Sequence, residues 1–340
     1  MYSEADLDAA VAAGAISASA AAALRAHAAH QRTTPAADEE QFRLLTGFND
    51  IFVAIATTLM LVALGWLANK IGPPVSAVAV AAASWGLAAF FTRRRRMALP
   101  SIILLVSFAS CAYVIGLMLA EAVLSIGPRR GGTGSIGAAG GAVVAVVATW
   151  FHWRRFHVPI TVAVGAVAAV GAVVAALLAL VPGLGDKWLA LLFACGIALF
   201  ALAMRWDMSD RARITRRSDV AFWLHLSAAP MIVHPVFAFL GLLGSGADIR
   251  QAVLASGLYL VLAVVALVVD RRALLVSALS YVLYAISTLV QAAGAVNVNF
   301  SLTALVVGSG LLLLSAFWHT ARRLVLGLVP GSLRARMPVA

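Results

Sequence analysis

The sequence predicts an all-α polytopic membrane protein, a transmembrane bundle of about ten helices with a short cytoplasmic helical region before it. Of 340 residues, 63% are hydrophobic and only 11% are charged, whereas charged residues make up about a quarter of a soluble domain. The mean hydropathy is +0.98. The basic residues fall in short clusters between apolar runs. That distribution is typical of a membrane protein and excludes a nucleic-acid-binding one.

Each expected span is an apolar run. A spanning helix needs about 20 mainly apolar residues, and backbone groups in lipid must be satisfied within the segment, so each run should be a helix. The fourth run is short, and the third is long enough to tilt. The expected spans are 49–69, 73–92, 99–126, 136–151, 158–182, 188–204, 220–244, 251–269, 273–293 and 300–318.

The distribution of Lys and Arg predicts the orientation. With ten spans and both termini in the cytoplasm, 20 basic residues lie inside and five outside, as the positive-inside rule requires. Arg also outnumbers Lys by 23 to 2, a bias expected of a high-GC bacterial genome, so we expect the bacterial inner membrane. The five basic residues expected outside are Lys70, Arg129, Arg130, Lys187 and Arg250.

Two regions are expected outside the bundle of residues 48–320. In residues 1–47, Gly14 can end a first helix and Ser17 can cap a second, because glycine adopts the left-handed conformation and serine accepts a backbone N–H. This region can lie on the membrane surface, or residues 1–37 can dock a protein partner. Residues 321–340 form an amphipathic basic tail, expected at anionic lipid headgroups of the cytoplasmic face.

The ninth span contains polar residues at steps of three and four, which place them on one helix face. Such a face should point into the bundle, where it forms either interhelical hydrogen bonds or the wall of a polar path. These residues are Ser277, Ser280, Tyr281, Tyr284, Ser287, Thr288 and Gln291.

Three further ionisable side chains lie within apolar runs. Glu121 is expected near the outer interface, about 32 Å along its helix, with an interfacial role or a role in handling protons or cations. His225 and His234 share the seventh span, and nine residues place them on opposite faces of a straight helix. Pro230 and Pro235 can alter that phase. We expect hydrogen-bonded core histidines; a proton relay is the alternative. No Cys, Asp or Glu stands at ligand spacing nearby, so no metal and no cofactor is expected.

Two glycine patterns precede and enter the fourth span. The first, Gly132-Thr-Gly134-Ser-Ile-Gly137, matches GxGxxG. It follows a membrane helix rather than a strand, so it lacks the context of a dinucleotide site. The second pattern pairs Gly137 with Gly141 at GxxxG spacing, which favours close helix packing.

Four segments resemble a group of uncharacterised bacterial polytopic membrane proteins, known only as a domain of unknown function. The resemblance covers most of the chain and implies no activity. Its segments are Gly14-Ala-Ile16-Ser17, Arg217-Ser-Asp-Val-Ala-Phe-Trp-Leu-His225, Asp270-Arg-Arg-Ala-Leu-Leu-Val-Ser277 and Phe317-Trp-His-Thr-Ala-Arg-Arg-Leu324.

Three functions remain open from the sequence. A membrane scaffold, sensor or accessory subunit would use the amino-terminal helices. A permease or exporter would need a polar path along the ninth span. An intramembrane enzyme is the least favoured, because the sequence contains no catalytic motif.

Overall fold

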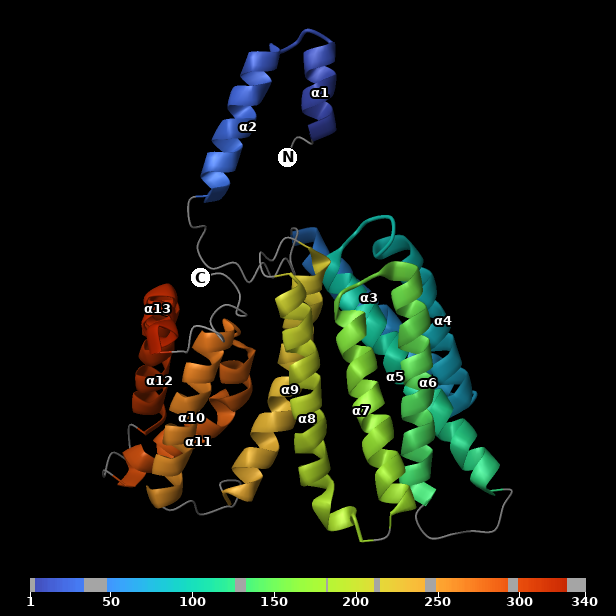
Figure 1. Ribbon diagram of the computed structural model, residues 1–340. Coiled ribbons are helices and arrows are strands. Elements are labelled where there is room, and N and C mark those ends of the chain that lie inside the picture. The colour runs from blue at the N-terminus through green and yellow to red at the C-terminus, as the bar shows by residue number, and fades with distance from the viewer. Residues whose placement is uncertain are drawn as a thin grey trace. The chain divides into compact units, whose positions relative to one another are not determined.

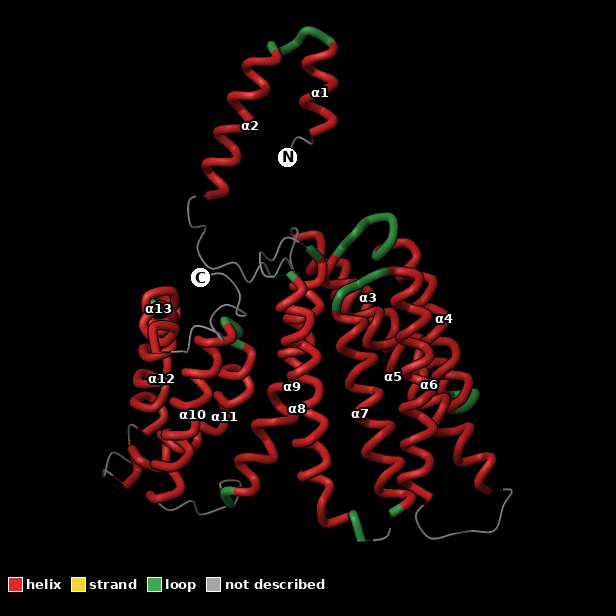
Figure 2. Tube along the Cα trace, viewed as in Figure 1, coloured by secondary structure: helices red, strands yellow, loops and turns green. Residues whose placement is uncertain are grey.

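The computed structural model describes residues 4–33, 48–125, 133–181, 183–210, 215–241, 249–292 and 299–328. Within these ranges the chain is helical, with short turns and no strand (Figure 2). Backbone contacts divide the chain into two compact units, Met1–Thr46 and Gly47–Ala340.

The first unit contains helices α1 (Glu4–Ala12) and α2 (Ala18–Thr33). Gly14 ends the first helix with a φ of +69°, and the Ser17 hydroxyl accepts the Ala20 N–H at 3.1 Å. Both residues therefore act as their positions predict. An ion pair between Arg25 and Asp8, at 2.6 Å, joins the two helices.

The second unit begins with five helices that are consecutive in the sequence. The helix at the fourth expected span, 136–151, is longer than that span, because it continues through the aromatic and basic residues that follow the apolar run. These helices are α3 (Phe48–Asn69), α4 (Pro73–Phe91), α5 (Ala98–Ser125), α6 (Thr133–Phe156) and α7 (Ile160–Leu180).

Six more helices and one short 3-10 turn complete this unit. The turn is η1 (Gly185–Lys187). The helices are α8 (Trp188–Ser209), α9 (Arg216–Phe239), α10 (Ile249–Val269), α11 (Ala273–Ala292), α12 (Asn299–Ala316) and α13 (Trp318–Leu328).

Among the described residues, the eight helices α3 to α10 are long and apolar enough to cross a membrane. Helices α12 and α13 meet the same criterion only together, and they are bent by 75° relative to each other. The apolar part of α11 that can be assessed, Leu275–Ser287, is shorter. Eight membrane-spanning helices are therefore assigned by length and composition.

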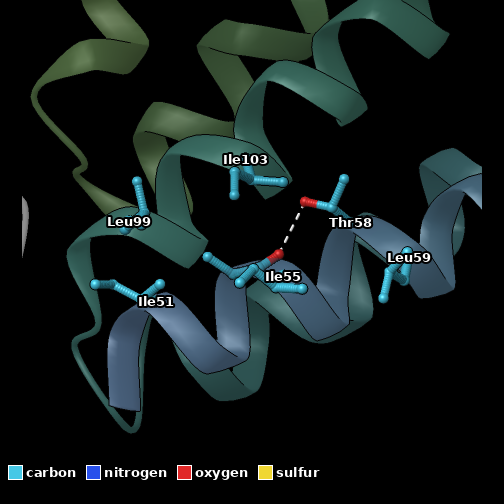
Figure 3. A pocket seen from close by; sticks show the side chains of 7 residues that line it. Ile51, Ile55, Thr58, Leu59, Leu99 and Ile103 are labelled. Carbon is cyan, nitrogen blue, oxygen red and sulfur yellow. Dashed lines mark hydrogen bonds between the residues drawn. The ribbon is translucent and has the colours of Figure 1, made fainter. Parts of the chain in front are cut away.

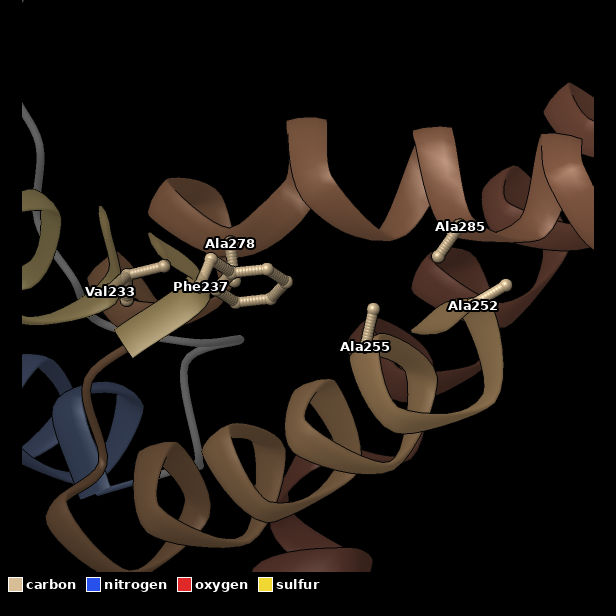
Figure 4. Close-up of a cluster of buried hydrophobic side chains, with 6 residues drawn as sticks. All are labelled: Val233, Phe237, Ala252, Ala255, Ala278 and Ala285. Atoms are coloured by element: carbon tan, nitrogen blue, oxygen red, sulfur yellow. The ribbon is translucent and has the colours of Figure 1, made fainter. Parts of the chain in front are cut away.

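The helices of the second unit pack in two groups. Helices α3 to α7 pack mainly on their neighbours in sequence, and α8 to α13 form the other group (Figure 1). Helix α7 contacts both α8 and α9 and so connects the groups. Helix α9 is continuous through Pro230 and Pro235. Phe237 of α9 lies among alanines of α10 and α11 (Figure 4).

Glycines allow α5 and α6 to approach closely. A Cβ atom added to Gly140 would lie 2.7 Å from the Ala120 Cβ, and one added to Gly141 would lie 2.8 Å from the Tyr113 carbonyl oxygen. Gly137 faces Leu117 and Glu121 in the same way. Small residues let helix backbones pack at short range. Gly137 and Gly141 therefore serve close helix packing.

Candidate functional site: a buried ionic cluster

Three deeply buried ionisable side chains, Asp207, His225 and Arg271, form a cluster that we call the ionic cluster. Their exposed fractions are 1%, 1% and 3%. Arg271 donates from Nε and Nη2 to both carboxylate oxygens of Asp207, with the Nε–Oδ2 distance at 3.1 Å. The His225 Nε2 lies 2.9 Å from Oδ2 of the same carboxylate. A two-pronged guanidinium–carboxylate pair of this kind is among the strongest polar contacts in proteins.

The three side chains come from separate elements. Asp207 stands in the last turn of α8, His225 lies about 13.5 Å along α9 from its first residue, and Arg271 lies in the turn between α10 and α11. Arg271 also donates to the backbone oxygen of Ser218 at 3.3 Å, near the start of α9. The ionic cluster therefore ties α8, α9 and the α10–α11 turn together.

A capping interaction fixes the neighbouring ends of α8 and α9. The Asp210 carboxylate accepts the Thr215 backbone N–H at 2.9 Å and its hydroxyl at 2.6 Å. The same hydroxyl accepts the Arg217 N–H at 3.2 Å and so caps α9. A cap of this type satisfies backbone donors that a helix leaves open at its start. It also holds α8 and α9 in the register that places Asp207 beside His225.

The α10–α11 turn makes a second set of contacts, with α13. Asp270 accepts the Trp318 indole N–H at 2.8 Å and forms an ion pair with Arg322 at 3.5 Å. Arg322, only 1% exposed, also donates to the Leu267 carbonyl oxygen at 3.2 Å. Asp270 adopts a φ of +59°, a left-handed conformation that Asp tolerates better than most non-glycine residues. These contacts hold the turn in that conformation.

Arg272 completes the turn by stacking on the same indole. Its guanidinium carbon lies 4.7 Å from the centre of the Trp318 ring. Burial lowers the pKa of Arg272, yet a guanidinium keeps its charge at neutral pH. Cation–π contacts gain strength where water is excluded. Three consecutive residues, Asp270 to Arg272, thus connect the turn to two different parts of the bundle.

The structure separates the two histidines of α9. His225 belongs to the ionic cluster, whereas the Nδ1 of His234 lies 2.7 Å from the Tyr281 hydroxyl of α11. The Tyr281 ring stacks on Phe237 with centroids 4.3 Å apart. The described residues contain no group of three or more His, Cys, Asp or Glu side chains that could hold a metal ion.

The other expected site residues lie elsewhere. Ser277 and Ser287 of α11 are half-buried, and Glu121 is exposed near the end of α5. On the same helix α5, Ser107 accepts a hydrogen bond from Ser84 of α4 at 3.1 Å. The side chains of four other polar residues expected in the ninth span lie outside those that the structure describes. They are Ser280, Tyr284, Thr288 and Gln291.

Sequence reasoning missed Asp207 and the roles of Arg271 and Arg322. The sixth expected span ended at residue 204, so Asp207 was assigned to a loop; α8 continues to Ser209 and buries it. Arg322 was expected at the lipid surface but is buried against Asp270. The segments containing His225, Asp270 and Trp318 are three of the four in which we expected a resemblance, and they meet here.

The ionic cluster can exchange a proton between a carboxylate and an imidazole, and it can join helices. A scan of protein-family models found no match, and neither curated proteins nor solved structures gave one. The function of the cluster has to be inferred from its residues and their geometry.

Proposed function

We propose that the chain is an integral protein of the bacterial inner membrane that acts as a scaffold, sensor or accessory subunit rather than as an enzyme. Ten spans follow if α11 and the α12–α13 pair cross the bilayer together with α3 to α10. The 20:5 distribution of basic residues supports cytoplasmic termini. The resemblance to uncharacterised bacterial membrane proteins is consistent with this assignment.

One observation supports a scaffold most directly: Asp207, Arg271, Asp270 and Arg322 each contact an opposite charge within the bundle. Asp207 pairs with Arg271 and His225, and Asp270 pairs with Arg322. Charges that bind a substrate must instead be accessible to that substrate. Matched charges between helices fix a particular arrangement, and such specificity is the best-attested use of buried ion pairs. The ionic cluster therefore suits a bundle that must keep one shape.

The amino-terminal unit provides a surface for a partner. It is compact by its own contacts, and the Arg25–Asp8 pair and the Ser17 cap organise it internally. Leu24 of α2 is 50% exposed. A helix that presents an apolar side chain can dock in a groove of another protein. We assign residues 1–37 to protein docking on the cytoplasmic side.

Site-specific photocrosslinking in native membranes tests this function. A photoreactive residue replaces Leu24 in the full chain, and the same residue replaces Leu67, a 70% exposed residue of α3, as the control. We expect a protein adduct of one defined mass from position 24 only, and its loss when residues 1–23 are deleted. Lipid adducts alone at both positions would contradict the docking role.

A permease is the second candidate, because buried Asp and His side chains also form proton relays in transporters. Reconstitution into vesicles with a pH-sensitive dye separates the two functions. A proton flux driven by added solutes, present in the wild type and absent in D207N, would favour the permease. A proton flux no greater than that of protein-free vesicles would favour the scaffold.

A further inference from the structure

An apolar groove runs along the outside of the first helix group, between α3 and α5 (Figure 3). Its volume is about 350 Å³. Ile55 and Leu59 on its wall are 56% and 66% exposed. The Thr58 hydroxyl, which also faces it, donates to the Ala54 carbonyl oxygen at 2.8 Å. The groove therefore presents a mainly apolar wall to a ligand.

The groove begins beside a strongly cationic turn. Helix α4 ends at Phe91 and α5 begins at Ala98, and the turn between them contains four consecutive exposed arginines, 93–96. Residues 92–98 include no acidic residue. Arg96 has a φ of +53°. Leu99, three residues further on, already lines the groove.

The arginine turn and the apolar groove lie one after the other along α3 and α5. Ile51 and Leu99 lie near the starts of α3 and α5, and both line the groove. From Ile51 to Leu59 the groove follows α3 for about 12 Å. An occupant would therefore have an anionic group at the arginines and an apolar chain extending from it along the helices.

We propose that the arginine turn and the α3–α5 groove bind one anionic phospholipid. The headgroup phosphate lies on Arg93 to Arg96, because guanidinium groups pair with phosphate oxygens by two hydrogen bonds. One acyl chain lies in the groove. Charge complementarity selects the headgroup, and the position of the groove on an apolar, exposed face selects a lipid over a water-soluble anion.

Native mass spectrometry of the full chain in detergent tests the site with two added lipids. These are phosphatidylglycerol and phosphatidylcholine with identical acyl chains. We expect the wild type to retain one phosphatidylglycerol at least about tenfold more readily than phosphatidylcholine. The quadruple Arg→Gln variant at positions 93–96 should lose this preference. The quadruple Arg→Lys variant keeps the charge but not the two-pronged hydrogen bonds, so it should keep only part of the preference. Thr58→Trp should fill the groove and weaken retention.

Two control variants separate the site from general membrane binding. R154Q/R155Q removes charges from the end of helix α6, and L67W adds an indole near the other end of α3. Both should retain phosphatidylglycerol as the wild type does. Circular dichroism and size-exclusion chromatography establish folding for each variant; if T58W is not monodisperse, T58L is used instead.

Four outcomes would overturn the proposal. Equal retention of both lipids would indicate an apolar surface without headgroup selection. An equal loss in R154Q/R155Q would indicate diffuse surface charge, and no effect of filling the groove would remove the acyl-chain contact. A lipid-free dimer that T58W or T58L abolishes would assign the groove to a second copy of the chain.

Discussion

Replacing Asp207 by asparagine should destabilise the bundle strongly. The substitution keeps the size of the side chain but removes the charge opposite Arg271. The Arg271 guanidinium, 3% exposed, would then remain in the bundle without its counter-ion. Removing one partner of a buried ion pair costs about 3–5 kcal/mol. Asparagine can still accept one of the present hydrogen bonds, so we expect a value near the lower end, about 3 kcal/mol.

Removing both partners should cost much less than the two single changes together. D207L/R271M leaves no buried charge at the pair, and apolar replacement of a buried pair is often near neutral. The His225 contact with Asp207, at 2.9 Å, is lost as well, which adds about 1 kcal/mol. The double variant should therefore lie within about 2 kcal/mol of the wild type.

Equilibrium unfolding in mixed micelles of a mild detergent and dodecyl sulfate measures these free energies. Circular dichroism at 222 nm follows helix content in the wild type, D207L, R271M, D207N and the double variant. The exposed Arg25–Asp8 pair, with side chains 39% and 71% exposed, is the control. D8N should change stability by less than about 1 kcal/mol.

The double-mutant cycle decides between a buried pair and an incidental contact. A coupling energy of about 3 kcal/mol or more between positions 207 and 271 is expected. Additive single effects, or a D207N variant as stable as D8N, would refute the reasoning. Asp207 would then not depend on Arg271 for its place in the bundle.

Three further predictions use the same unfolding measurement. G140A should lower the free energy of unfolding by about 1–3 kcal/mol, because its new Cβ lies 2.7 Å from the Ala120 Cβ. The control G86A, with no atom within 4 Å of the added carbon, should be neutral or slightly stabilising. Equal stability of the two variants would contradict close α5–α6 packing. W318F removes the indole donor to Asp270 and should cost about 1–3 kcal/mol. The control W188F, at a 44% exposed position, should cost less than about 0.5 kcal/mol. Equal stability of W318F and W188F would exclude a stabilising contact between Trp318 of α13 and Asp270. Y281F removes the hydroxyl 2.7 Å from His234 and should cost about 1 kcal/mol, and an unchanged free energy would show that this bond contributes nothing.

Hydropathy predicted the helices well because spanning segments must satisfy their backbone groups locally. All ten expected runs coincide with helices, from α3 to α12. Their ends were less predictable, because a helix can extend beyond its apolar core. Helix α8 continues to Ser209, and this extension turned Asp207 from an expected loop residue into a buried one. Helix α6 gained Trp153 and Phe156 in the same way.

The partners of charged residues could not be predicted from local sequence. A count of basic residues treats Arg271, Arg272 and Arg322 alike, as charges on one side of a membrane. Their environments differ because pairing depends on helices distant in sequence: Arg271 meets Asp207 of α8, and Arg322 meets Asp270.

The brevity of the α10–α11 turn is a further indication that its charges are structural. Asp270, Arg271 and Arg272 fill the turn between two long apolar helices. A turn of three residues holds its side chains close to the ends of both helices, so contacts with the bundle are within their reach. In the structure all three contact other elements of the bundle. A short, fully charged turn between spanning helices thus indicates ion pairing across the bundle, in addition to the orientation that its arginines predict.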